Sequence, residues 1–312
     1  MTDARVLFFD IPDFDRKYFL QVDLEFQTYR GFRELGARAP ALATTLHSWI
    51  FRACLTMRGS ADGSKTASVL DMYNQAIEAL EWGYRTRQDV PNTEHRGIFQ
   101  ETFLRKLKCL RMECYVDMYY EDKTKYLLQH VYEEAKGILH ELVSAAPPAE
   151  NIAPSCKLAF YVYPRALANM TIAIYYYELA DGARKDNDYE SVKKYFCQAA
   201  DYSAHAATDY PQDDEEHLGA LVFLFEMMFF SGAHTVKDLL DVMHRVRLAM
   251  PKANKFWEGS SKIVQFRKNA RDMQARSDKL VRAVRAGDLM MASKVAKPGV
   301  YPPDVYSPDL YL

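Results

Sequence analysis

The sequence predicts an all-α protein in which antiparallel helical hairpins stack side by side. One pattern occurs four times: an aromatic or apolar residue, a small or apolar residue three positions later, and a larger one seven positions after the first. These positions share one face of a helix, because a turn takes about 3.6 residues. The middle members are Ala76, Ala135, Val192 and Leu239, which recur at similar intervals along the chain. A helix that recurs in this way is typical of stacked hairpins.

Strand signals are nearly absent. The run Val6–Phe9 is the only strand candidate, and one strand cannot form a sheet. Helix breakers instead fall at intervals along the first half, with Gly59 and Gly63, Pro91, and then Pro147. We therefore expect helices near 14–35, 41–58, 66–87, 95–120 and 124–145. The fourth of these has an apolar stripe at intervals of three and four positions: Phe99, Phe103, Leu107, Leu110, Cys114 and Met118.

The second half continues the helical pattern. We expect helices near 155–181, 188–208, 214–231, 235–249 and 260–296. Two apolar stretches, 158–180 and 220–230, raise the question of a membrane. The first contains charged residues and the second is too short to span a bilayer, so we expect both to be buried central helices rather than transmembrane segments.

Composition limits the class of protein more than its function. The net charge of −2 over 312 residues favours neither nucleic acid nor a membrane as partner, and 49% apolar residues suffice for a large core. The five cysteines are odd in number and none forms a CxxC pair, which predicts buried thiols in a reducing compartment. The N-terminal stretch Met1–Asp15 carries acids on both sides of a short apolar run and no basic region. We expect an intracellular protein, cytoplasmic or nuclear.

The repeated helix resembles the second helix of a tetratricopeptide repeat. That family favours Tyr, Ala, a large apolar residue, Ala and Pro at fixed offsets. The second copy here matches in spacing, with Tyr132, Ala135, Leu139, Leu142 and Pro147, and the fourth copy follows with Val236, Leu239, Met243, Val246 and Pro251. The resemblance covers 65–251 and implies a tetratricopeptide-like α-solenoid with a concave surface for a peptide or helix.

The match departs from the family pattern in two respects. The family repeats about every 34 residues, a shorter period than the one found here. The Trp-x-x-Leu-Gly signature of its first helix is also missing. A narrower arrangement is similar to fungal meiotic tetratricopeptide proteins, which scaffold crossover and synapsis factors. It consists of residues 73–84, an acidic linker, a long helix rich in Leu and Arg, and residues 131–135.

The most basic part of the chain is 262–297, with ten basic residues against three acidic ones. A basic amphipathic helix is compatible with a solvated capping helix, with an acidic protein partner, or with nucleic acid or a membrane surface. The candidate partner-binding residues on it are Arg271, Arg276, Lys279, Arg282 and Arg285.

The tail that begins at Pro298 repeats one four-residue unit, Pro303–Tyr306 and then Pro308–Tyr311. Proline prevents a helix, and tyrosine supplies a large rigid contact area. We add Tyr306 and Tyr311 to the candidate partner-binding residues. The tail is either a linear motif for another protein or a strap in the protein's own groove.

A helical enzyme or small-molecule binder is the alternative. The string Asp213–His217 resembles the aspartate-rich magnesium motif of helical terpene synthases, and Asn187 with Ser191 resembles the start of that family's second metal motif. Tyr195 stands where that motif needs Glu, and the two motifs come in reversed order. An acidic helix start after Pro211, which complements the helix dipole, explains the string better than a metal site does.

The sequence therefore predicts a non-enzymatic scaffold for protein–protein interaction, with a helical-repeat array over 1–251, a basic capping helix region over 252–297 and a Pro/Tyr-rich tail over 298–312. We expect a peptide or helix, possibly acidic, as the partner. We expect neither a cofactor nor catalytic residues, because the sequence has no two histidines four positions apart, no GxSxG motif and no glycine-rich phosphate loop. The partner's identity and the oligomeric state stay open.

Overall fold

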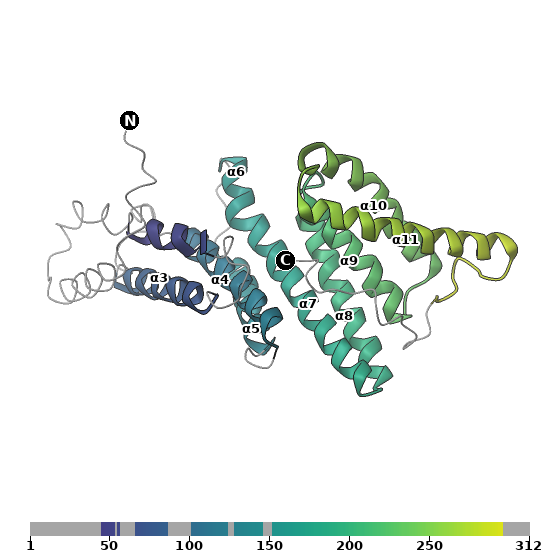
Figure 1. Ribbon diagram of the computed structural model, residues 1–312, viewed down its shortest axis with the longest axis horizontal. Coiled ribbons are helices and arrows are strands. Elements are labelled where there is room, and N and C mark those ends of the chain that lie inside the picture. The colour runs from purple at the N-terminus through teal and green to yellow at the C-terminus, as the bar shows by residue number, and fades with distance from the viewer. Residues whose placement is uncertain are drawn as a thin grey trace. The chain divides into compact units, whose positions relative to one another are not determined.

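A computed structural model describes residues 45–53, 55–56, 66–86, 101–123, 128–145 and 152–295 (Figure 1). The chain divides into two compact units, Met1–Ser48 and Trp49–Leu312. Of the first unit, only the helical residues 45–48 are described. The strand candidate at 6–9, the helix expected at 14–35 and the tail 298–312 lie outside the described residues. The elements below all belong to the second unit.

Its described elements are all helical, which confirms the all-α part of the predicted fold class. They are α3 (Thr66–Thr86), α4 (Glu101–Glu121), α5 (Leu128–Ser144), α6 (Pro154–Lys157), α7 (Tyr163–Lys185), α8 (Tyr189–Asp209), α9 (Glu215–Ser231), α10 (Val236–Trp257) and α11 (Ser261–Ala286). A π-helical turn, η5 (Leu158–Val162), joins α6 to α7. Within the described ranges the only β-type pairing is an isolated bridge between Thr235 and Lys294.

Helices that are neighbours in sequence pack against each other. Contacts join α3 to α4, α4 to α5, α7 to α8, α8 to α9, α9 to α10 and α10 to α11 (Figure 1). Arg165 near the start of α7 pairs with Asp209 at the end of α8 at 2.6 Å, so these two helices are antiparallel. In addition, α5 packs on α7, and α11 packs on α9.

The repeated pattern marks the buried seams. Its middle residues, Ala76, Ala135, Val192 and Leu239, are all 1% exposed or less. Small or apolar side chains at these positions let neighbouring helices approach closely. The first position is less uniform. Tyr73 and Val236 are buried, whereas Tyr189, the first residue of α8, is 48% exposed.

The most enclosed helix is α9, which is buried on nearly all sides and supplies Phe223 and Phe225 to the largest core cluster. Its Gly219 faces Phe266 of α11 so closely that a Cβ there would lie 2.6 Å from the ring Cζ. Glycine therefore sets the distance between α9 and α11. Over the described residues, no helix is both long and apolar enough to cross a membrane, as expected for the two apolar stretches.

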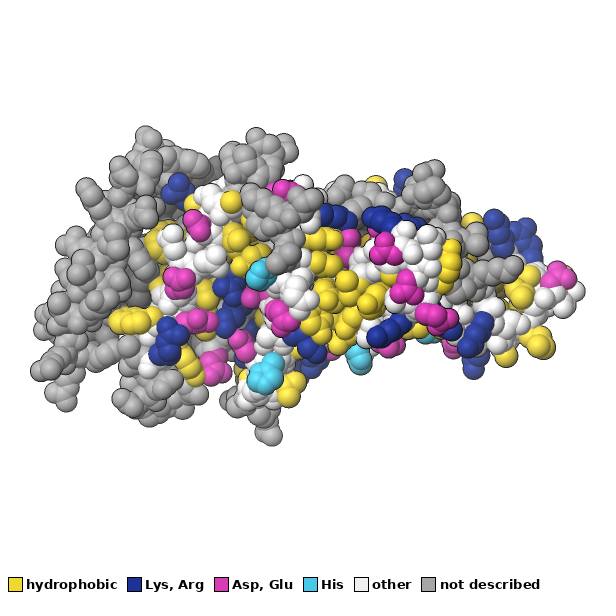
Figure 2. Space-filling model, turned by 90° about the horizontal axis from the view of Figure 1, so that it is seen from below, with side chains coloured by type: hydrophobic (Ala, Val, Ile, Leu, Met, Phe, Trp, Pro, Cys, Tyr) yellow, Lys and Arg dark blue, Asp and Glu magenta, His cyan; other side chains and the backbone are white. Residues whose placement is uncertain are grey.

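Tyrosines fill much of the seam between α5, α7 and α8. The rings of Tyr132 and Tyr175 lie 4.4 Å apart between centroids, and Tyr176 stacks on both Tyr195 and Tyr202. These rings pack in the offset and edge-on arrangements that aromatic pairs prefer. In the face seen in Figure 2, hydrophobic side chains gather near the middle, and charges of both signs are interspersed around them.

Two expected helix boundaries are wrong. The helix expected to end at residue 249 continues through Pro251 to Trp257. The missing amide of Pro251 costs one hydrogen bond, and the burial of Ala253 in the core helps to offset that loss. The helix expected to reach residue 296 ends at Ala286, where Gly287 adopts the left-handed conformation with φ of 82°.

The segment after Gly287 turns back to the start of α10. The amides of Val236 and Lys237 donate to the carbonyl oxygens of Ser293 and Met291, each at 3.0 Å. The first amides of a helix have no acceptor within the helix, so this segment satisfies two of them.

Candidate functional site: a groove between the last two helices

The helices α10 and α11 form an antiparallel hairpin, and the first turn of α10 is held by a helix cap. Thr235 and Asp238 form a capping box, in which each side chain accepts a hydrogen bond from the backbone amide of the other residue. At the other end of α10, Arg267 Nε donates to Asn254 Oδ1 at 2.7 Å, which ties the two helices together near their connecting turn.

A groove with a volume of about 360 Å³ runs along this hairpin. Its apolar lining consists of Met243, Val246, Met250, Pro251 and Ala270, and its polar lining of Arg247, Asn254, Arg267, Arg271 and Gln274. On each helix the lining residues follow at intervals of three and four, which is the spacing of one helical face. An aliphatic floor is thus bordered from both helices by guanidinium groups.

Two of the three arginines of this groove are held by side-chain amides. Arg247 Nε donates to Gln274 Oε1 at 2.7 Å, and Arg267 to Asn254. Asp278 lies 4.0 Å from Arg247, but both side chains are about half exposed, so the pair is weak. Arg271 is exposed, and among the described residues it has neither an ion pair nor a hydrogen bond. Amides orient the guanidinium groups without cancelling their charge.

Pro251 belongs to the floor of the groove. A proline within a helix has no amide to donate to the carbonyl four residues earlier, which here is that of Arg247. The ring also clashes with that carbonyl, and such positions usually bend a helix. The residue that the sequence suggests as a helix end therefore lies within α10 and contributes to the floor of the groove.

The predicted site residues divide among several environments. Arg271 borders the groove. Lys279, Arg282 and Arg285 are exposed along the last third of α11, beyond the groove, and Arg282 Nε donates to the carbonyl oxygen of Asp278. Tyr306 and Tyr311 lie outside the described residues.

Arg276 lies on another face of α11. Its guanidinium stands over the rings of Phe229 and Phe230, at 5.5 and 5.9 Å from their centroids, and so packs on the last turn of α9. A cation is favourable there, both above an aromatic face and at the C-terminal end of a helix. Five positions separate Arg276 from Arg271, which turns it about 140° around the helix axis.

The sequence prediction missed Arg247 and Arg267. Arg247 lies before the basic stretch, and Arg267 belongs to that stretch but is not among the predicted residues. A usable signal is present, since Arg247, Met250 and Asn254 follow a helical spacing that crosses the expected helix end. Only a helix that continues past Pro251 brings Asn254 onto the same face.

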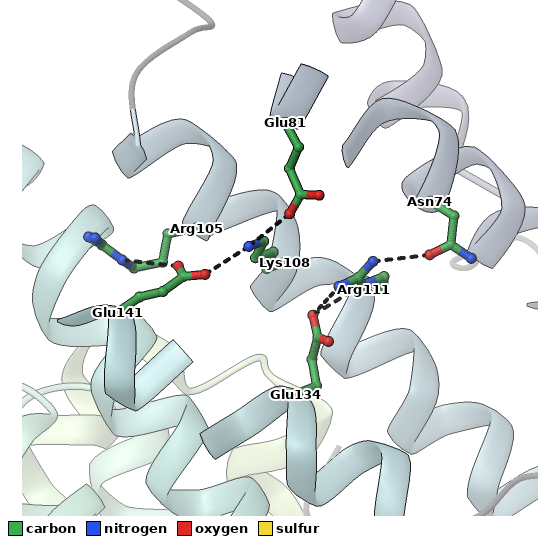
Figure 3. A network of polar contacts seen from close by, with 7 residues as sticks. All are labelled: Asn74, Glu81, Arg105, Lys108, Arg111, Glu134 and Glu141. Carbon is green, nitrogen blue, oxygen red and sulfur yellow. Dashed lines mark hydrogen bonds and ion pairs between the residues drawn. The ribbon is translucent and has the colours of Figure 1, made fainter. Parts of the chain in front are cut away.

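A second row of cations, on α4, provides a contrast (Figure 3). Lys108 Nζ lies 2.7 Å from Glu141 and 3.1 Å from Glu81. Arg111 donates twice to Glu134, at 2.7 and 3.1 Å, and once to Asn74 at 3.2 Å. Each of these cations faces a carboxylate from α3 or α5, so the network fastens three helices together.

Arg105 completes that row in the most buried position. It is 2% exposed, its Nη1 donates to the carbonyl oxygen of Phe160 at 3.3 Å, and its guanidinium lies 5.7 Å from the centroid of Tyr161. Both partners belong to the π-helical turn η5, so Arg105 joins α4 to the entry of α7. Glu141 Oε2 stands 3.9 Å from its Nε.

The acidic string at 213–217 opens α9. The Asp214 side chain caps the helix by accepting from the amide of Glu216 at 2.9 Å, and it also accepts from the hydroxyl of Tyr163. Asp188 caps α8 in the same way by accepting from the amide of Ser191 at 3.2 Å. The two motifs lie near opposite ends of α8, whose 21 residues span about 31 Å along the axis. Across the described ranges, no cluster of three or more acidic, histidine or cysteine residues could hold a metal ion.

The described cysteines, Cys109, Cys114, Cys156 and Cys197, are free thiols. Burial raises the pKa of the Cys109 thiol to about 12, which keeps it protonated and unreactive at neutral pH. Cys54 lies outside the described side chains.

Comparisons with models of protein families, with curated proteins and with solved structures give no match to this chain.

Proposed function

We propose that this protein is a non-enzymatic scaffold whose helical hairpins stack as a tetratricopeptide-like α-solenoid, and that it binds an extended acidic segment of a partner protein in the α10/α11 groove. The observation that carries the proposal is the apolar floor bordered by three arginines. Of these, within the described part of the chain, only Arg247 has a carboxylate nearby, that of the half-exposed Asp278 at 4.0 Å. Neighbouring helices that pack in sequence order, with small residues in their seams, support the repeat architecture.

The dimensions of the groove favour a short extended segment. From Met243 to Asn254 the lining of α10 spans about 16 Å along the helix axis. An extended chain covers about 3.3 Å per residue, so roughly five residues fit. Side chains alternate along such a chain, so apolar residues can face the floor while carboxylates between them reach the arginines.

The chemistry of the rim favours carboxylates. A guanidinium presents a planar fork of donors that matches a carboxylate, and such charge-assisted bonds are the stronger ones. Nucleic acid fits less well, because the floor is aliphatic and its described lining offers no aromatic ring on which bases could stack.

The test uses a fluorescein-labelled ten-residue peptide that alternates Asp or Glu with Leu or Tyr, titrated with the full chain and followed by fluorescence anisotropy. A matched peptide with Lys in place of each acid, and a single-stranded oligonucleotide, serve as comparison probes. We expect the acidic peptide to bind most tightly, and its affinity to fall as salt rises.

Two charge-reversing substitutions test whether the peptide binds in the groove. Arg271→Glu should weaken its binding by about tenfold or more, since a charge-assisted hydrogen bond contributes about 1.5–3 kcal/mol. Arg285→Glu is the matched control, because it makes the same charge change on an exposed residue of α11 outside the groove, and there we expect about twofold or less. Equal losses in the two variants, or tighter binding of the oligonucleotide, would contradict the proposal.

A further inference from the structure

We infer that residues 298–312 of the chain itself occupy the α10/α11 groove, so that a partner binds only by displacing this tail. The inference rests on the proposed function, because it assigns the groove its first occupant. Three features carry it: the point at which the described chain ends, the length and charge of the segment that follows, and the composition of the groove.

The described chain ends beside the start of α10. The Ser293 carbonyl accepts from the amide of Val236 and Lys294 pairs with Thr235, so Val295 lies next to the first turn of α10. The groove begins at Met243, about 10 Å further along the helix, and ends at Asn254, about 27 Å along it. Seventeen residues follow Val295, and fully extended they can span about 56 Å. The tail can therefore run along α10 and reach both ends of the groove.

The charge of the tail is complementary to that of the groove. Residues 298–312 contain Asp304 and Asp309 and no basic residue, whereas the groove lining contains three arginines and no acidic residue. The two aspartates are five positions apart, about 16 Å in a polyproline conformation. This is about the length of the α10 lining from Met243 to Asn254, so one carboxylate can reach each end.

The side chains beside the aspartates suit the floor. Each Pro-Asp unit continues with an aliphatic residue and a tyrosine, namely Val305 with Tyr306 and Leu310 with Tyr311. The floor offers aliphatic and thioether groups to such side chains. Prolines restrict the free chain to extended conformations, which lowers the entropy lost on binding.

Attachment to the same chain makes a weak contact sufficient. A short flexible connection gives an effective concentration in the millimolar range. A tail segment that would bind with a Kd of about 100 µM as a free peptide would then fill the groove roughly nine-tenths of the time, and the affinity for an external peptide would fall about tenfold.

The first experiment locates the tail directly. The photo-crosslinking residue p-benzoylphenylalanine replaces Tyr306 in the full chain, and mass spectrometry identifies its partners after irradiation at low protein concentration. We expect links within one chain to residues 243–254 or 267–274. The same probe in a chain that also carries Asp304→Lys and Asp309→Lys should lose them. Links to other helices, or links only between separate chains, would overturn the inference.

The second experiment separates this inference from the proposed function. The acidic peptide is titrated against the wild-type chain and against the chain with Asp304→Lys and Asp309→Lys. We expect the variant to bind about tenfold more tightly. Equal binding would sink the tail inference and leave the proposed function standing. Cross-links in the groove without binding of the acidic peptide to either chain would support the tail inference and contradict the proposed function, since the groove would then bind the tail alone.

Discussion

Two rows of cations in this protein have opposite environments. On α4, Lys108 and Arg111 each face a carboxylate from a neighbouring helix at 2.7 Å. Along the α10/α11 groove, Arg247 and Arg267 are held by the amides of Gln274 and Asn254. Both rows look alike in the sequence, as basic residues at helical spacing. The difference teaches that the partner of a cation, rather than the number of cations, decides whether a helix face fastens the fold or is available to a ligand.

The physical reason lies in what each partner does to the charge. A carboxylate neutralises a guanidinium, and the pair is costly to break because the remaining charge is left partly buried. An amide fixes the direction of the guanidinium and leaves its charge in place. The arginines of the groove thus keep a charge that the proposed acidic segment can use, whereas the α4 cations already have carboxylate partners.

The largest effect on stability should come from the α4 row. Arg111→Ala removes two hydrogen bonds to Glu134 and one to Asn74, and leaves that glutamate, which is 17% exposed, without its cation. We expect unfolding in urea to show a loss of about 2–3 kcal/mol. Arg111→Lys keeps the positive charge but loses the planar guanidinium that donates twice to Glu134. Its loss of stability should therefore lie between zero and that of Arg111→Ala. A loss no larger than the roughly 0.5 kcal/mol typical of an exposed ion pair would show that the two rows do not differ as described.

The contact between Gly219 of α9 and Phe266 of α11 should give the next largest effect on stability. Gly219→Ala would place a Cβ 2.6 Å from the Phe266 ring, and that ring is fully buried. Overpacking of this kind costs about 1–3 kcal/mol, so we expect a lower urea midpoint.

Gly182→Ala is the matched control for that substitution. It lies in α7, and a Cβ there would meet nothing within 4 Å. Alanine in such a helical position should stabilise the protein by about 0.5–1 kcal/mol. If both variants lose stability equally, close packing between α9 and α11 is not the reason.

A smaller, pH-dependent effect is expected on α4 next to its cation row. Burial, together with Glu113 and Glu121, raises the pKa of Asp117 to about 6. Because the folded pKa lies above the unfolded one, ionisation of Asp117 destabilises the fold, and this penalty is fully present above pH 6. Asp117→Asn should therefore be more stable than wild type at pH 7–8, with the difference shrinking as pH falls from 6 to 4. Urea unfolding across this pH range measures it, and a difference that grows toward pH 4 would contradict the assignment.

The smallest effect on stability is expected at the groove itself. Arg271 is exposed, and the described residues give it no partner, so Arg271→Ala should change the free energy of unfolding by no more than about 0.5 kcal/mol. Thermal unfolding of this variant beside Arg111→Ala compares the two rows directly. A loss at Arg271 as large as that at Arg111 would mean that the groove arginine also fastens the fold.

Local signals were enough to predict the helical character of the described residues. The burial of Ala76, Ala135 and Val192 follows from their spacing alone, because a helix places them on one face. Pro251 misled the sequence reasoning, since a proline penalty is local whereas the packing that outweighs it comes from elsewhere in the chain. Gly287 was a sound end signal, but the basic and apolar pattern continued past it and concealed it.

The candidate site was less predictable. Arg271 was identified from the basic stretch, but its orientation relative to Arg276 depends on which face of α11 meets α9, and charge counts carry no such information. Arg247 joins the site only because α10 and α11 fold back on each other, which brings the distant Gln274 within hydrogen-bonding distance.

The return of residues 287–295 to the beginning of α10 also has a mechanical consequence. A force that pulls on the chain at Val295 is met first by the hydrogen bonds from Val236 and Lys237, and only afterwards by α11. The last helix is thereby protected from being peeled off its neighbours from its end. A load transmitted through the tail would be carried into α10 at its capped first turn.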